Sequence, residues 1–293
     1  MLLMMDSRGD LGALIEAELS YAGYLGSETK SAGHLYGILR EYQSRFVPEI
    51  KHTVELSDTL KANPKLEIYK VVVDEICDVL KAGGNLRPYM SSKIDRFAKH
   101  GRDYLQLHWG LSHLHLSSIA TVRANGLVER ADDLLFLRVK NGVAHLVDIL
   151  AHSEVGIFEN KRLLDVVDRN WPRLHVHAKG ISKPTTDHTP EQIRRLRRLN
   201  YQHVEWVNGR AVMPTYGTNA AGTPSEAIIQ YDRMRIQLDV IQHDIRKRFF
   251  TYFPANRNLW LAYVRLYEVA KDGYLVREIN SNQDAKALYP SAS

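Results

Sequence analysis

The clearest pattern in the chain is Leu111-Ser-His-Leu-His-Leu116, followed by Leu134-Leu-Phe-Leu-Arg-Val139 and Val143-Ala-His-Leu-Val-Asp-Ile-Leu150. In the first segment histidine alternates with leucine, which is the period of a β-strand. The second and third segments are joined by Lys140-Asn-Gly142. Asn-Gly between two apolar runs is the strongest short-range signal for a hairpin. We therefore expect three antiparallel strands between residues 111 and 150.

Helical spacing of apolar residues dominates the chain before these strands. It predicts helices over 8–24, 30–46 and 64–82. The third helix has clear end signals, because Asn63 can cap it, Pro64 suits its first position and Gly83 can end it.

The chain after the strands mixes both patterns. A helix is expected at 160–169, and the turn-forming residues of 178–190 predict a mobile loop or a boundary. The remaining expected elements are an arginine-rich helix at 190–199, a hairpin turning at Asn208-Gly209, a long helix from Pro224 to about Arg248, and a closing hairpin at 259–279. The sequence thus predicts an α+β fold. Its parts are a helical region, 1–105, and a mostly antiparallel sheet region with a long C-terminal helix and hairpin, 106–293.

Composition excludes several classes of protein. Of 293 residues, 44% are hydrophobic and 25% are charged, which is typical of a folded globular chain. The single cysteine, Cys77, forms no intramolecular disulfide, which favours a reducing compartment. The first ten residues lack the features of a secretory signal, and no run approaches the roughly 20 apolar residues of a membrane helix. We therefore expect a cytoplasmic protein without membrane contact.

The sequence lacks the common catalytic motifs, namely the phosphate-binding glycine loops, Cys-x-x-Cys, His-Glu-x-x-His and Gly-x-Ser-x-Gly. Histidines are the remaining candidates. His113 and His115 are two apart in a predicted strand, so they point to one face. If the strands 111–116 and 143–150 are neighbours, Asp148 and His152 can join them there.

Three interpretations of these histidines stay open. In the first, they are the acid and base of RNA cleavage, since imidazole titrates near neutrality. Arg138 or Arg130 then stabilises the extra charge on phosphorus, and no metal or cofactor is needed. In the second, His113 and His115 bind a divalent metal with Asp148 or His152. In the third, they are structural. A second pair, His175 and His177, lies beside a predicted loop and is the less favoured metal candidate.

Cations elsewhere suggest where a nucleic acid would bind. The formal net charge of +5 permits an anionic partner. Phosphate contacts are assigned to the arginine cluster Arg194, Arg195, Arg197 and Arg198, although a solvated helix face is the simpler explanation of the cluster. Trp109 can stack on a base or belong to the core. Asp103 and Tyr104 precede the first strand and are expected at one end of a cleft.

The segment from His108 to His152 resembles a His-Leu-His-Leu pattern in uncharacterised bacterial proteins. Helices followed by a small antiparallel sheet bearing His and Arg are also similar to the RelE and barnase class of ribonuclease toxins. This resemblance covers about residues 100–175 and rests on architecture and residue type. It implies RNA cleavage without a metal, and neutralisation by a partner protein such as an antitoxin or inhibitor.

The expected function is therefore a metal-independent endoribonuclease of the toxin or defence type. His113 and His115 would be base and acid in either order, and His152 would assist. A metal-dependent hydrolase with a His-x-His site is one alternative. A non-enzymatic binding or assembly protein of a mobile element is the other, and the sequence leaves the oligomeric state open.

Overall fold

The computed structural model describes residues 2–26, 30–92, 94, 103–154, 156–159, 161–183, 188–201, 203–214, 223–256 and 260–288. Helices and mixed or antiparallel sheets together make an α+β fold, as the sequence predicts. The chain divides into two compact units, one formed by residues 1–39 with 226–293 and the other by 40–225.

This division differs from the expected boundary near residue 105. Strand β1 (Leu2–Met5) pairs in parallel with β9 (Leu261–Ala270), with Leu2 opposite Leu261. The two ends of the chain therefore build one unit. The helices α3 (Asp58–Lys61), α4 (Pro64–Ile68) and α5 (Lys70–Ala82) belong to the other unit. A pairing between strands so distant in sequence leaves no local signal.

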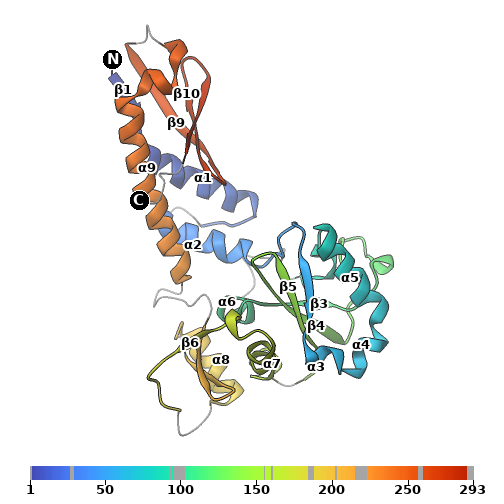
Figure 1. The fold of residues 1–293 in the computed structure, drawn as a ribbon. Helices are drawn as coiled ribbons and strands as arrows, with labels where there is room; N and C mark the ends of the chain where they lie inside the picture. Colours follow the sequence, from blue (N-terminus) through green and yellow to red (C-terminus); the bar gives the residue numbers. More distant parts are fainter. Residues whose placement is uncertain are drawn as a thin grey trace. The chain divides into compact units, whose positions relative to one another are not determined.

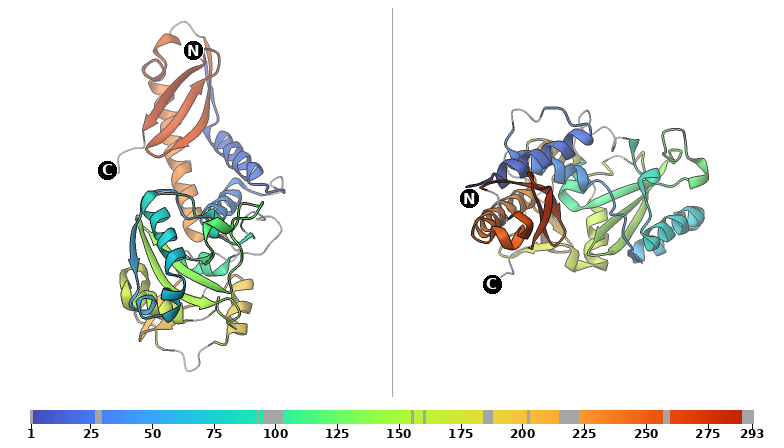
Figure 2. Two further views of the ribbon diagram at one scale, coloured as in Figure 1. Left: turned by 90° about the vertical axis from the view of Figure 1, so that its right-hand side faces the viewer. Right: turned by 90° about the horizontal axis from the view of Figure 1, so that it is seen from above.

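The terminal unit is a four-stranded sheet in the order β1-β9-β10-β11, packed on helices. The closing hairpin is confirmed as β9 and β10 (Gly273–Glu278), and β11 (Gln283–Leu288) extends it. The expected N-terminal helices are α1 (Ser7–Tyr21) and α2 (Ala32–Gln43), and the expected long helix is α9 (Ser225–Lys247), followed by α10 (Phe249–Tyr252). Leu238 and Ile241 of α9 share a core with Val264 and Val276 of the sheet. Figure 2 shows the long helix running beside this sheet.

The sheet of the second unit has the order β2-β5-β4-β3. Its strands are β2 (Thr53–Leu56), β3 (Leu111–His115), β4 (Asp133–Lys140) and β5 (Val143–Ala151). The three expected antiparallel strands are confirmed, and Asn141 and Gly142 have the positive φ that their tight turn requires. Strand β2 adds a parallel partner to β5. Because β4 lies between β3 and β5, the supposed direct neighbourhood of segments 111–116 and 143–150 is wrong.

Both faces of this sheet are covered, as Figure 1 shows for α5 and α7 (Arg162–Asn170). One face packs its leucines against Val73, Ile76 and Leu80 of α5. The other face packs against α6 (Tyr104–Trp109) and α7, and against a three-stranded sheet ordered β6-β8-β7. The strands of that small sheet are β6 (Val176–Ala178), β7 (Glu205–Val207) and β8 (Arg210–Met213). Helix α8 (Pro190–Arg198) completes the unit.

Two further expectations concern interruptions of regular structure. The helix expected over 64–82 is broken at Tyr69, which ends α4 and precedes α5. The loop expected at 178–190 falls partly outside the described residues, at 184–187, and its described positions 179–183 hold no helix or strand. In the described parts of the chain, no helix is long and apolar enough to cross a bilayer.

Candidate functional site

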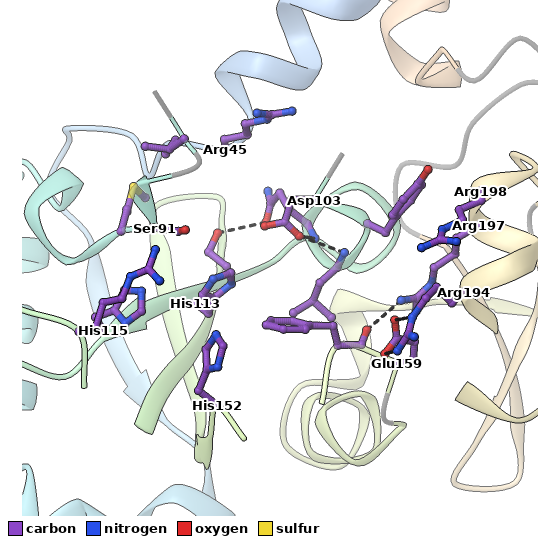
Figure 3. A pocket seen from close by; sticks show the side chains of 18 residues that line it. Arg45, Ser91, Asp103, His113, His115, His152, Glu159, Arg194, Arg197 and Arg198 are labelled. Carbon is purple, nitrogen blue, oxygen red and sulfur yellow. Dashed lines mark hydrogen bonds and ion pairs between the residues drawn. The ribbon is translucent and has the colours of Figure 1, made fainter. Parts of the chain in front are cut away.

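A cavity of about 590 Å³ opens in the second unit at strand β3, the last strand of the four-stranded sheet. Its volume lies within the roughly 300–1,000 Å³ of pockets for small ligands. His113, His115, His152 and Arg130 all line it. Figure 3 shows the three histidines on one side and Arg194, Arg197 and Arg198 on the other. The cavity thus gathers imidazoles and guanidinium groups from sequence positions far apart.

The histidines are positioned by β3 and by the segment that follows β5. His113 and His115 are two residues apart on β3, opposite Phe136 and Leu134 of β4. The backbone N–H of His152 donates to the carbonyl of Asp132, 2.6 Å away, which fixes the chain just beyond β5. His152 is itself exposed. The rings of His113 and His152 both lie near Phe158, with centroid separations of 5.4 and 6.3 Å.

His115 is the most buried imidazole of the three. Burial, together with the neighbouring His113, Arg130 and His152, lowers the pKa of His115 to about 4. Burial disfavours the imidazolium form, and nearby cations act in the same direction. His115 is therefore neutral at physiological pH and can accept a proton.

The arginines come from helix α8, which begins with a capping box between Thr189 and Gln192. Residues three and four apart share one face of a helix. Arg194, Arg197 and Arg198 have this spacing and line the cavity, whereas Arg195 lies outside its lining. Arg194 already forms an ion pair with Glu159, with 3.1 Å between Nε and Oε1.

Arg194, Arg197 and Arg198 together form an arginine wall of the cavity. Arg197 is unusual among them, because it is only 3% exposed. Its Nη1 donates to the carbonyl of Phe158 at 2.8 Å, while its Nε lacks a hydrogen-bond partner among the described residues. Burial lowers the pKa of Arg197, although Glu159, Glu205 and Asp103 oppose the shift. A buried cation with an unused donor is costly, and an anion bound in the cavity would offset that cost.

Four of the expected site residues lie elsewhere. Arg138 is 2% exposed and its Nη2 donates to the carbonyl of Leu174 at 2.8 Å, so it supports the core rather than the cavity. Trp109 is buried in the apolar cluster between sheet and helices, and it cannot stack on a ligand base. Asp148 is fully buried and accepts hydrogen bonds from Asn63 and Arg162. Arg195 is the fourth such residue, because it does not line the cavity.

The metal set His113, His115, Asp148 and His152 is not assembled. Among the described residues, the potential metal ligands that do come together are Asp168, His175 and His177. The less favoured histidine pair is therefore the one with a carboxylate beside it. The sequence signal for this cluster was the His-x-His spacing, but nothing local connected it with Asp168 on α7.

Several cavity residues had weak or no sequence signals. Asp103 and Tyr104, expected at one end of a cleft, do line the cavity, and Asp103 caps α6 by accepting from the N–H groups of Leu105 and Gln106. Arg45, Phe158 and Glu159 also line it. They were missed because they come from connecting segments without a regular pattern.

Comparison of the chain with family models, curated proteins and solved structures finds no match. The resemblance to the RelE and barnase class therefore rests on the sequence pattern alone. What the cavity can do follows from its own side chains. They offer a neutral imidazole, two further imidazoles beside it, and a wall of arginines suited to phosphate groups.

Proposed function

We propose that this cavity binds RNA and cleaves its phosphodiester bonds without a metal ion. The observation that carries the proposal is the convergence of His113, His115, His152 and Arg130 in one cavity that also has an arginine wall. Phosphodiester transfer requires a base, an acid and a positive charge near phosphorus. Each of these is available here from side chains alone.

His115 is assigned as the base because its depressed pKa keeps it neutral. It takes the proton of the ribose 2′-hydroxyl, and the 2′-oxygen attacks the adjacent phosphorus. The bond from phosphorus to the 5′-oxygen breaks, and His113, assisted by His152, protonates that leaving oxygen. The products are a 2′,3′-cyclic phosphate and a free 5′-hydroxyl. The negative substrate itself favours protonation of His115, which brings its pKa back towards neutrality.

Arg130 is assigned to the charge that develops on phosphorus. It lines the cavity, and its charge acts on His115. Its Nη2 donates to Ser92 Oγ at 3.1 Å, which leaves other guanidinium donors for an anion. Arg130 is therefore preferred to Arg138 for this role, because the guanidinium of Arg138 is buried in the core and donates to Leu174.

Arg197 and Arg198 are assigned to a second phosphate along the strand. Both line the side of the cavity opposite the histidines, as Figure 3 shows. A substrate with two or more phosphates can therefore span the cavity, whereas a single nucleotide fills only part of it. We expect oligonucleotides to be cleaved more efficiently than a dinucleoside monophosphate.

The test is the product of RNA cleavage in excess chelator. Single-stranded RNA should be cut into fragments that end in 2′,3′-cyclic phosphate. An otherwise identical strand of 2′-deoxynucleotides should stay intact, because it lacks the nucleophile. Cleavage that requires added divalent metal, or that proceeds equally on the deoxy strand, contradicts the proposed chemistry.

A further inference from the structure

A second cluster of potential ligands lies at Asp168, His175 and His177, outside the lining of the cavity described above. Asp168 is near the end of α7, and the two histidines flank the start of β6. The 3-10 turn at Pro172–Leu174 connects these elements. His175 is in an extended conformation, so it and His177 project to the same side of the chain.

The three side chains are already close to the geometry of a metal site. His177 Nε2 lies 2.7 Å from Asp168 Oδ1, and His175 Nδ1 lies 3.6 Å from the same oxygen. Ligand atoms around a tetrahedral Zn²⁺ are about 3.3 Å apart, given metal–ligand bonds of about 2.0–2.1 Å. The candidate donor atoms of all three residues lie within 4.8 Å of one another, so shifts of about an ångström would bring them to ligand spacing.

His175 has buried ring nitrogens that could ligate a metal ion. Its side chain is completely buried, and neither ring nitrogen has a hydrogen-bond partner among the described residues. Buried polar groups are almost always hydrogen-bonded or coordinated, and an orphan costs about 1–3 kcal/mol. A metal bound through Nδ1 would give one of these two ring nitrogens a partner.

The carboxylate of Asp168 is held in the orientation that a ligand needs. Its Oδ2 accepts from Arg210 Nη2 at 2.8 Å and from Asn208 Nδ2 at 3.1 Å. Oδ1 is left facing the two imidazoles. Hydrogen bonds to the outer oxygen of a ligating carboxylate are typical of metal sites. Arg210 is half exposed, so solvent screens its charge.

We propose that Asp168, His175 and His177 bind one Zn²⁺ ion, with water in the fourth position. Two imidazoles and one carboxylate are a donor set that zinc accepts, and His177 is exposed enough to leave one side open to solvent. The ion would join α7 to β6 and so fix the three-stranded sheet on the larger one. The site is independent of the proposed RNA chemistry.

The test is metal content and thermal stability of the full chain after removal of any affinity tag. Protein stripped with a chelator is incubated with zinc, passed through a desalting column and analysed by atomic emission. We expect about one zinc per chain and a Tm several degrees above that of the stripped protein. With Co²⁺ instead, a four-coordinate site should give intense absorption in the visible region.

Variants locate the ion. His177→Gln should lose both the zinc and the Tm increase, and His175→Ala should do the same if it folds. His152→Gln, which removes an exposed histidine of the other site, should keep both. Absence of zinc from the wild-type chain after loading, or its full retention in His177→Gln, overturns the proposal and leaves only a hydrogen-bonded Asp168–His177 pair beside a buried His175.

Discussion

The ring of His113 lies 5.4 Å from the ring of Phe158, although β3 carries one residue and the segment after β5 carries the other. Phe158 also approaches His152, and its carbonyl accepts from Arg197. One residue thus contacts both the histidine side and the arginine side of the cavity. We infer that Phe158 holds the imidazoles in place.

Truncation of Phe158 should therefore impair chemistry more than binding. In Phe158→Ala we expect kcat for RNA to fall about 10- to 100-fold, with KM little changed, because small misplacements of reacting groups are costly. Phe158→Leu should restore most of the rate. Steady-state kinetics on one RNA measures both constants. A rise in KM alone would show that Phe158 serves binding and does not position the histidines.

Arg195 and Arg198 of α8 form a matched pair for testing the phosphate contacts. Arg198 lines the cavity and Arg195 does not, although both are exposed. Arg198→Ala should reduce the dependence of log affinity on log salt by about 0.7, the value for one phosphate contact on a single strand. Arg195→Ala should leave it unchanged. Fluorescence titrations of uncleavable 2′-deoxy oligonucleotide across salt concentrations give these slopes, and equal effects of both variants contradict the assignment.

Burial of His115 also predicts a pH dependence of stability. Its pKa falls from the ordinary 6.5 to about 4 on folding. Between these values the unfolded chain binds a proton that the folded chain does not, so stability is lost as pH falls through this window. Between pH 7 and pH 5 the wild-type chain should lose roughly 1–2 kcal/mol more of its free energy of unfolding than His115→Gln does. Urea unfolding at both pH values measures it, and an identical loss in the variant contradicts the burial effect.

Two glycines with the same φ angle should tolerate alanine differently. Gly83 and Gly142 both have φ +76°, but a Cβ at Gly83 would lie 2.8 Å from the backbone of Ile50, whereas at Gly142 nothing lies within 4 Å. Gly142→Ala should lower the free energy of unfolding by about 1 kcal/mol, from backbone strain alone. Gly83→Ala should cost about 3 kcal/mol or more, because the clash is added. Chemical denaturation gives both values, and equal costs contradict the close approach.

Local structure was predictable where one short pattern determines it. The turn at Asn141-Gly142 and the one at Asn208-Gly209 both adopt the expected positive φ values. The shared face of His113 and His115 also follows from strand alternation. The spacing of Arg194, Arg197 and Arg198 is compatible with one helix face, but Arg195 is also three residues from Arg198, so only the fold separates it from the cavity.

Tertiary placement was not predictable in the same way. The parallel pairing of Leu2 with Leu261 joins the two ends of the chain, and no local pattern encodes it. Arg138 was expected in the site because an arginine on a predicted strand of the sheet could stabilise charge on phosphorus, yet here its guanidinium reaches a carbonyl in the core. Asp168 meets His175 only because α7 folds back on β6, so their cluster emerges from the fold.

The most direct test compares kcat/KM for RNA cleavage in His113→Gln and His115→Gln with wild type, in chelator and with folding verified by thermal melting. The proposed roles of acid and base predict losses of about 100- to 10,000-fold in each variant. His243→Gln, which changes an exposed histidine on α9, should cleave at the wild-type rate. Wild-type rates in both His113→Gln and His115→Gln, or no cleavage by the wild-type chain, would contradict the account.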